Sequence, residues 1–269
     1  MSGGVTAERG TLTMGHLNVK DFDLAATVRS GHLFAYDDLG KGKFRVINGN
    51  KSFVVEQKKS LLRYSGITEK ELLFFFDLDL DVAALQRRLG KDRALRPLLV
   101  RYKEIRLVRQ DVRQAILTFI LSSNNNQKRI KGMVDRHRAC VARSEMEYVR
   151  LGFGYRAPWI AAAEARLSPS FLATLRSLDY DDAKSLLLSL PGVGPKVADC
   201  VLAYSELARG EAFPADVWVK RALKRWYPSY FRDKPLTDKN IRLFAQKKFG
   251  DDAAYAQHYL FLAAQELLR

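Results

Sequence analysis

The chain has 269 residues, of which 47% are hydrophobic and 28% charged, a balance typical of a globular protein and not of a disordered one. No window reaches the roughly 18 uncharged apolar residues of a membrane span. Two cysteines are too few for a four-cysteine zinc or iron–sulfur site. The sequence therefore predicts a soluble, cytoplasmic protein without a membrane partner, whose thiols stay reduced.

The charge balance points to a class of partner. The chain carries 45 Lys and Arg against 30 Asp and Glu, a formal net charge of +15. The excess is spread through the sequence and is not gathered in a tail. A basic surface of this kind favours a polyanion such as nucleic acid, although a thermophilic or ribosome-associated protein would have a similar balance.

The predicted elements change character along the chain. Residues 1–18 are expected to be frayed. Residues 22–64 predict a small antiparallel sheet, because the pair Asn48–Gly49 between two apolar runs is a hairpin signal. From about residue 68 the apolar spacing becomes helical, which gives a mostly α protein of the α+β class. Helices are expected over 111–122, 126–142, 145–151, 157–167, 169–176, 179–189, 195–208, 217–226, 237–249 and 252–268.

The segment 190–199 reads LPGVGPKVAD and predicts two helices joined by a tight hairpin. Gly192 and Gly194 permit close approach by another backbone, and Pro195 suits the first turn of a new helix. The amides of Val193 and Gly194 are expected to point outward, where they would bind a phosphate. An ordinary helix–helix connection would use the same turn residues.

A lysine and an aspartate follow this hairpin. Lys196 stands in the first turn of the second helix, where the helix dipole disfavours another cation and favours the neutral, nucleophilic amine. Asp216 directly precedes a helix, so a plain N-cap is its simplest interpretation. A carboxylate near the amine would also stabilise a cationic transition state. Cys200 lies four residues after Lys196, on the same face of the helix.

These segments resemble the helix-hairpin-helix DNA glycosylases, in the branch that carries a hairpin lysine. Further segments match in order to the C-terminus and narrow the resemblance to the 8-oxoguanine DNA glycosylase/AP lyases of the eukaryotic type, here as a prokaryotic member. These segments are LVRQD at 107–111, SSNNN at 122–126, GMV at 132–134, LGFGYRA at 151–157 and AQHYLF at 256–261.

The resemblance implies an N-terminal sheet domain and a helical body in two parts, with the DNA cleft between the parts. The expected division is 1–93 for the sheet domain with flanking helices, 94–143 with 238–269 for a helical domain, and 144–237 for the hairpin domain. The protein is expected to act as a monomer.

The resemblance also assigns the chemistry. Lys196 would attack the sugar carbon that bears the base, form a Schiff base and cleave the strand by β-elimination, and Asp216 would stabilise the cationic sugar. The base must first leave the stack, because neither group can reach that carbon inside a duplex.

Four residues are expected to bind the extruded base. Phe261 would stack on it and Gln257 would bond its pairing edge. The carbonyl of Gly31 would accept from the N7–H that 8-oxoguanine has and guanine lacks. Cys200 is assigned to the same pocket. Core packing is the simpler interpretation for Phe261, and an ordinary turn for Gly31.

The expected partner is duplex DNA that contains 8-oxoguanine opposite cytosine. Asn124 and the arginines would address that cytosine, and Tyr155 would wedge beside it. No cofactor or metal is expected in the chemistry, because an amine and a carboxylate suffice, and the resemblance allows a structural cation held by hairpin carbonyls. The residues expected at the DNA are Asn124, Arg129, Tyr155, Arg156, Gly192, Val193, Gly194 and Trp218.

Three departures from the family pattern stand out, and two alternatives remain. The family's Gly-Gln-x-Phe-Arg-Trp stretch reads Gly31-His32-Leu33-Phe34-Ala35-Tyr36 here, and Trp218 replaces an expected histidine. The segment between Cys140 and Leu151 is also much shorter than in eukaryotic members. A related glycosylase for an alkylated base or mismatched adenine would share the architecture. A non-catalytic DNA-binding module would explain the charge and the glycines, but it gives no purpose to Lys196, Asp216 or the pair Gln257 and Phe261.

Overall fold

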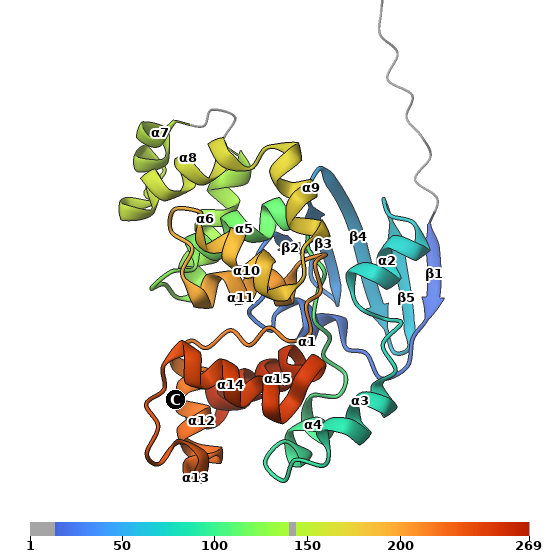
Figure 1. Ribbon diagram of the computed structural model, residues 1–269. Helices are drawn as coiled ribbons and strands as arrows, with labels where there is room; N and C mark the ends of the chain where they lie inside the picture. Colours follow the sequence, from blue (N-terminus) through green and yellow to red (C-terminus); the bar gives the residue numbers. More distant parts are fainter. Residues whose placement is uncertain (1–13, 140–143, 269) are drawn as a thin grey trace, which may run out of the picture.

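The computed structural model describes residues 14–139 and 144–268, and it contains one antiparallel sheet and a larger body of helices (Figure 1). The predicted class, α+β and mostly α, is confirmed. The expected fraying of residues 1–13 and the helical end at 140–142 fall outside the described residues.

The sheet has five strands in the order β1-β5-β4-β3-β2, and every pair is antiparallel. Its members are β1 (Gly15–Asn18), β2 (Tyr36–Asp38), β3 (Lys43–Asn48), β4 (Lys51–Lys58) and β5 (Leu61–Ser65). The predicted hairpin is β3–β4, but Asn48 pairs with Lys51, so the two-residue turn is Gly49–Asn50 and lies one residue later than expected. Gly49 has φ +58°, the positive value that such hairpin turns need at their first position.

Two expectations for the N-terminal region are wrong. Residues 15–18 are not frayed but form the edge strand β1, in which Leu17 pairs with Leu62 of β5. Residues 24–28, expected within the sheet, form the short helix α1, whose N-cap Asp23 accepts a hydrogen bond from the amide of Ala26. That capping bond satisfies a first-turn amide and so favours the helix locally.

The remaining helices follow the predicted pattern, including α2, α3 and α4 in the region after residue 68 where the apolar spacing becomes helical, and α13 is additional. They are α2 (Glu69–Phe75), α3 (Val82–Leu89), α4 (Arg96–Tyr102), α5 (Val112–Leu121), α6 (Gln127–Ala139), α7 (Glu145–Arg150), α8 (Ala157–Arg166), α9 (Pro169–Ser177), α10 (Tyr180–Leu188), α11 (Pro195–Tyr204), α12 (Val217–Trp226), α13 (Pro228–Phe231), α14 (Asp238–Phe249) and α15 (Ala253–Leu267). Within the described ranges, none of these helices is both long and apolar enough to cross a bilayer.

Helix α11 ends four residues earlier than predicted. Its last carbonyl, on Tyr204, accepts hydrogen bonds from the backbone and the side chain of Gln110. The amide of Glu206 then donates to the carbonyl of Gln110 at 2.7 Å. The backbone after Tyr204 therefore pairs with an extended segment and leaves the helix.

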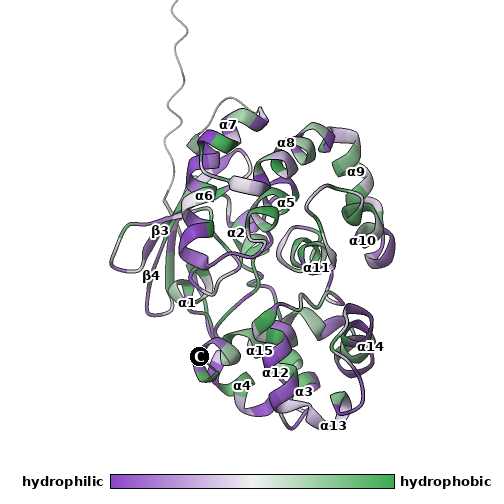
Figure 2. Cartoon of the chain, turned by 90° about the vertical axis from the view of Figure 1, so that its left-hand side faces the viewer, coloured by the Kyte–Doolittle hydropathy of each residue, from purple (hydrophilic) through white to green (hydrophobic). Residues whose placement is uncertain are grey.

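The helices form two groups beside the sheet (Figure 1). Helix α5 packs against α11, α8 and α6, and α10 packs against α11, whereas α15 packs against α12, α14 and α4. The expected division placed α5 and α6 with the terminal helices and α12 with the hairpin, whereas these contacts join α5 to α11 and α12 to α15. The domain boundaries themselves stay a prediction. Helix α11, buried from Val197 to Tyr204, runs through the centre of its group in the hydrophobic colours of Figure 2.

Candidate active site

A cavity of about 1060 Å³ opens between the two groups of helices. Its walls come from the α5–α6 loop, the hairpin before α11, the segment before α12, the helix α15 and the segment 31–34. Most of the predicted site residues line it, namely Gly31, Asn124, Gly192, Val193, Gly194, Lys196, Asp216, Trp218, Gln257 and Phe261. The sequence-based set therefore converges on one place, although its members come from distant parts of the chain.

The amine of Lys196 is held at the wall of this cavity. Its Nζ donates a hydrogen bond to the Oγ of Ser122 at 3.1 Å and lies 5.9 Å from the centre of the Phe119 ring. Ser122 donates its own proton to the carbonyl of Phe119 at 2.7 Å, so its oxygen is free to accept from the lysine. Sequence reasoning gave Ser122 no role, although it opens the motif at 122–126.

The hairpin requires glycine at one position. Gly192 has φ +78°, and a Cβ built there would lie 2.9 Å from the Cβ of Trp159. Both the backbone conformation and the contact therefore exclude an unstrained side chain. Gly194 is the N-cap of α11 and has no side chain that could accept a hydrogen bond. The first-turn amides of Lys196 and Val197 therefore receive no side-chain capping bond.

The prediction for Val193 is wrong in one respect. Its amide does not point outward as a free donor, because it donates to the carbonyl of Leu190 at 3.2 Å. This bond closes the turn between α10 and α11. Any anion at the hairpin would therefore be bound by the amides of Gly194 and of the first helical turn, without that of Val193.

Asp216 is the N-cap of α12, as the simpler interpretation held. Its Oδ1 accepts from the amides of Trp218 and Val219, at 2.9 Å each. Burial raises the pKa of this carboxyl above its usual value, and the two amides and the nearby Lys196 ammonium oppose that shift. The cap holds the carboxylate rigidly at the wall that also carries Lys196, so the two roles are compatible.

Gly31 and Phe261 lie against each other at the far side of the cavity. Gly31 has φ +92°, and a Cβ there would lie 2.4 Å from the Nε2 of Gln127 and 3.4 Å from the Cε1 of Phe261. Glycine is therefore the residue that fits this position. The arrangement brings a backbone segment and an aromatic face together, as a pocket for a flat base requires.

Gln257 is 3% exposed, and both ends of its amide are bound. The hydroxyl of Tyr204 donates to its Oε1 at 2.7 Å, and its Nε2 donates to the carbonyl of Pro214 at 2.8 Å. Tyr204 was not predicted as a site residue. The signal was present, since Lys196, Cys200 and Tyr204 are spaced four apart and share one helical face.

Cys200 does not reach the cavity wall. Its side chain is 4% exposed and lies behind the site. Burial raises the pKa of the Cys200 thiol to about 11, although the neighbouring Lys196 ammonium opposes this. The residue is therefore a buried neutral thiol close to Lys196, and its assignment to the base pocket stays a prediction.

The residues expected at the orphaned cytosine surround the α5–α6 loop. Asn124 has φ +46°, a conformation that asparagine tolerates better than most side chains. Arg156 is buried, and its guanidinium donates to the carbonyls of Ser123 and Asn124, the latter at 3.0 Å. Tyr155 is 50% exposed and donates to the same Ser123 carbonyl at 3.1 Å. Arg129 is exposed. In this structure Arg156 supports the loop from behind.

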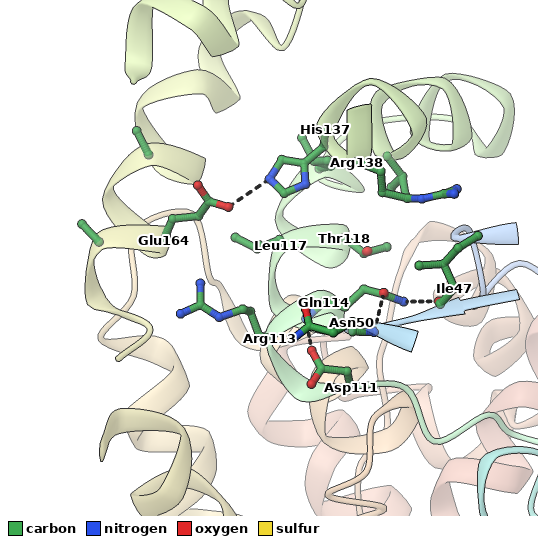
Figure 3. Close-up of a pocket in the computed structure, with 15 residues that line it drawn as sticks. Ile47, Asn50, Asp111, Arg113, Gln114, Leu117, Thr118, His137, Arg138 and Glu164 are labelled. Carbon is green, nitrogen blue, oxygen red and sulfur yellow. Dashed lines mark hydrogen bonds and ion pairs between the residues drawn. The ribbon is translucent and has the colours of Figure 1, made fainter. Parts of the chain in front are cut away.

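A second cavity, of about 650 Å³, lies between the β3–β4 turn, α5, α6 and α8 (Figure 3). The amide of Gln114 points to the turn, where it donates to the carbonyl of Ile47 at 3.0 Å and accepts from the amide of Gly49 at 3.1 Å. The Nε2 of His137 and the Oε1 of Glu164 are hydrogen-bonded at 3.1 Å. These polar groups connect secondary-structure elements, so the larger cavity is the candidate site.

The predicted set contains no metal centre. Across residues 14–139 and 144–268, no three side chains among His, Cys, Asp and Glu converge to hold an ion. The structural cation that the resemblance allows would use backbone carbonyls of the hairpin near Gly192 and Gly194, and it stays a prediction.

Comparisons with known proteins show which sequences and structures this chain is similar to. Residues 16–116 match the family model of the 8-oxoguanine DNA glycosylase N-terminal domain. A protein of Methanothermobacter thermautotrophicus, named a probable N-glycosylase/DNA lyase, is 42% identical over 111 residues, which are 41% of this chain and 34% of that protein. The N-glycosylase/DNA lyase OGG1 of Arabidopsis thaliana is 30% identical over 226 residues, which are 72% of this chain and 62% of that protein. The chain thus spans less than two thirds of the length of these two relatives.

A solved structure covers nearly the whole fold. It is that of the Clostridium acetobutylicum 8-oxoguanine glycosylase/lyase in complex with double-stranded DNA that contains cytosine opposite 8-oxoguanine. It matches with a TM-score of 0.82 and 27% identity, over 93% of this chain and 94% of that one. The chain therefore belongs to the 8-oxoguanine DNA glycosylase family.

Proposed function

We propose that the protein is a bifunctional DNA repair glycosylase and AP lyase that removes 8-oxoguanine from duplex DNA. The observation that carries this proposal is the placement of the Lys196 amine and the Asp216 carboxylate on the wall of one cavity of about 1060 Å³. A nucleophile and an anion at one site are what the displacement of a base from a sugar requires.

The reaction follows from these two groups. The Lys196 ammonium first gives one proton to solvent. Its nitrogen then bonds to C1′ as the bond from C1′ to N9 of the base breaks, and the base leaves with the bonding electrons and takes up the proton that the attached nitrogen gives off. Asp216 stabilises the positive charge that develops on the sugar. The sugar ring then opens to an imine between Lys196 and C1′. Loss of a proton from C2′ expels the 3′ phosphate and cleaves the strand.

The base would be held at the Gly31 side of the cavity. Phe261 offers an aromatic face for stacking, and Gln257 offers its amide to the pairing edge. The carbonyl of Gly31 would accept from the N7–H of 8-oxoguanine and repel the N7 lone pair of guanine. A mismatch of this kind costs roughly 1–3 kcal/mol.

The DNA would bind across the mouth of the cavity. The first-turn amides of α11 suit a phosphate, and Trp218 lines the cavity wall, where it would lie near the sugar. Asn124, with Arg129 and Tyr155 nearby, would face the base opposite the lesion, cytosine. Arg156 would act by holding this loop. The protein would act as a monomer and without a cofactor, at the chromosome of a prokaryotic cytoplasm, or in the nucleus if the source is eukaryotic.

Borohydride trapping tests the proposal. Reduction of the imine fixes the enzyme to duplexes that carry 8-oxoguanine opposite cytosine, and Lys196→Gln should abolish this adduct while duplex binding remains. Lys220→Gln serves as the matched control, because Lys220 is a second lysine at the same cavity and its variant should still be trapped.

The alternatives give different results in the same assay. An adduct that forms only with duplexes carrying another damaged base would indicate a related glycosylase of different specificity. If the wild type forms no adduct with any lesion but still binds duplex DNA, the protein is a non-catalytic DNA-binding module and the proposal is wrong.

A further inference from the structure

The hydrogen bonds of the Gln257 amide leave one donor and one acceptor for a ligand. A glutamine amide has two donor hydrogens and two acceptor lone pairs. One lone pair accepts from the hydroxyl of Tyr204 at 2.7 Å, and one hydrogen is donated to the carbonyl of Pro214 at 2.8 Å. One donor and one acceptor remain for the cavity, at fixed ends of the amide.

A tyrosine hydroxyl alone would not fix this orientation, because it can donate or accept. Its second neighbour is the Nδ1 of His258, at 3.4 Å. The Nε2 of His258 is buried and has no hydrogen-bond partner among the described residues. An unpaired buried N–H is rarer than an unpaired acceptor, so we assign the ring proton to Nδ1. His258 then donates to Tyr204, and among the described residues the acceptor left for the Tyr204 proton is Gln257.

The surrounding rings hold this chain of bonds in place. His32 packs against Tyr204 at 4.9 Å and against His258 at 4.6 Å between ring centres. The nitrogens of His32 are used elsewhere: Nε2 accepts from the amide of Val108 at 3.2 Å, and Nδ1 pairs with the hydroxyl of Ser30 at 2.6 Å. His32 therefore contributes packing and does not compete for the Tyr204 hydroxyl.

We propose that Tyr204 and His258 are positioning residues that lock the amide of Gln257 in one orientation and so make the site selective for a guanine-type pairing edge. A guanine-type edge has an acceptor at position 6 and a donor at position 1, and an adenine-type edge has the reverse. A freely rotating amide would match either edge by turning through 180°. In the locked orientation it matches only one.

This inference rests on the proposed function, in which Gln257 reads the edge of the extruded base. Reversal of the amide would place Oε1 against the Pro214 carbonyl and would leave the Tyr204 proton without an acceptor. Both penalties fall on an adenine-type base and not on a guanine-type base. The lock thus acts on a part of the base that the Gly31 carbonyl does not address.

Two substrates isolate the effect. 8-Oxoguanine and 8-oxoadenine share the C8 carbonyl and the N7–H, and they differ in the pairing edge. The experiment measures single-turnover excision of each base from otherwise identical duplexes. Strand cleavage at a preformed abasic site normalises each preparation. The readout is the excision rate of 8-oxoguanine divided by that of 8-oxoadenine. A general loss of folded protein would not change this ratio.

Tyr204→Phe should lower this ratio by about 5- to 10-fold, the effect of one lost hydrogen bond. His258→Phe keeps a ring of similar size and removes the Nδ1 donor, so it should lower the ratio in the same direction even if the first variant folds poorly. Tyr255→Phe is the matched control. Its hydroxyl is also buried but donates to Asp77 at 2.7 Å, and this variant should keep the wild-type ratio.

Gln257→Leu distinguishes reading of the base edge by Gln257 from orientation of its amide by Tyr204 and His258. It should lower the ratio itself, and Tyr204→Phe should then add no further change, since the residue that the tyrosine acts through is gone. One outcome is that Gln257→Leu lowers the ratio while Tyr204→Phe and His258→Phe leave it at the wild-type value. In that case Gln257 reads the base edge, but the proposal that Tyr204 and His258 orient its amide is wrong. If Gln257→Leu also leaves the ratio unchanged, edge reading by Gln257 is wrong, and the lock is wrong with it.

Discussion

The Nζ of Lys196 and the Oγ of Ser122 form a hydrogen bond of 3.1 Å across 74 positions of the sequence. Ser122 is the C-cap residue of α5, and its proton is committed to the Phe119 carbonyl. Its oxygen therefore acts as an acceptor that holds the amine at the cavity wall. The bond joins the end of one helix to the first turn of another, so the position of this amine depends on the packing of α5 against α11.

We expect Ser122→Ala to slow formation of the trapped imine by up to about 10-fold, because one neutral hydrogen bond contributes roughly 0.5–1.5 kcal/mol. Affinity for the duplex should change little, since Ser122 acts on the lysine. Single-turnover trapping and equilibrium binding measure the two effects. Ser189→Ala is a close control, because Ser189 is the C-cap of α10 and its hydroxyl also donates three residues back at 2.7 Å. Equal trapping rates in both variants would contradict the role of Ser122.

Asp216→Asn separates the capping role from the charge. Asparagine caps helices about as well as aspartate, so urea unfolding should give nearly the wild-type free energy. Excision should nevertheless fall by about 100-fold or more, because the anion that stabilises the developing cation is lost. Asp216→Ala should lose the same activity and also roughly 1 kcal/mol of stability. Wild-type excision by Asp216→Asn would show that the carboxylate is only a cap.

The same carboxyl predicts a pH dependence. Burial raises the pKa of Asp216, so the folded protein holds this proton more tightly than the unfolded chain does. As the pH falls through the folded-state pKa, the wild type should therefore gain stability relative to Asp216→Asn. The excision rate should fall over the same range, because the ionised form is the active one. Unfolding free energies and excision rates of both proteins across the acidic range test the sign.

The hairpin glycines should differ in their tolerance of a side chain. Gly192→Ala forces a Cβ into a positive φ and to 2.9 Å from Trp159, so we expect a loss of about 1–3 kcal/mol. Gly194 has φ −96° and no atom within 4 Å of a built Cβ. Gly194→Ala should therefore cost only about 0.5 kcal/mol, for the poorer N-cap. Urea unfolding of both variants measures the two losses of stability. Equal losses would show that the turn adapts to a side chain at Gly192.

Cys200 should resist alkylation in the folded protein. Burial raises the pKa of its thiol from 9.0 to about 11, and the thiolate is the reactive form. In a Cys140→Ser background, iodoacetamide should modify Cys200 far more slowly in buffer than in denaturing urea at the same pH. The raised pKa also means that this group's contribution to stability is complete below pH 9.0 and is lost as the pH rises toward about 11. Rapid modification of the native protein would show that the thiol is accessible.

Much of the helical body could be predicted because its apolar spacing is regular and its ends carry capping residues. Asp216 and Asp179 are such caps, and each begins a helix where the sequence indicates. β1 was missed because four residues carry too little periodicity, and its pairing with β5 is a long-range contact. The end of α11 was missed because Gln110, far away in sequence, pairs with the backbone after Tyr204.

The site was predicted more completely in its residues than in its bonds. Lys196, Asp216, Gln257 and Phe261 do meet at one cavity. The hydrogen-bond partners of individual polar groups could not be predicted, because they depend on turn geometry and on neighbours from other segments. The Leu190 carbonyl takes the Val193 amide. Arg156 was assigned to DNA by resemblance, yet its side chain is buried, and burial of a single arginine is not visible in a sequence.

Recognition and chemistry share one short stretch of main chain. Pro214 accepts from the amide of Gln257 at 2.8 Å, and two positions later Asp216 receives the first amides of α12. In the proposed reaction, the spacing between these two positions would set how deep the base sits relative to the carboxylate. Insertion or deletion of a single residue there would shift the Gln257 amide relative to the Asp216 carboxylate while leaving each helix intact.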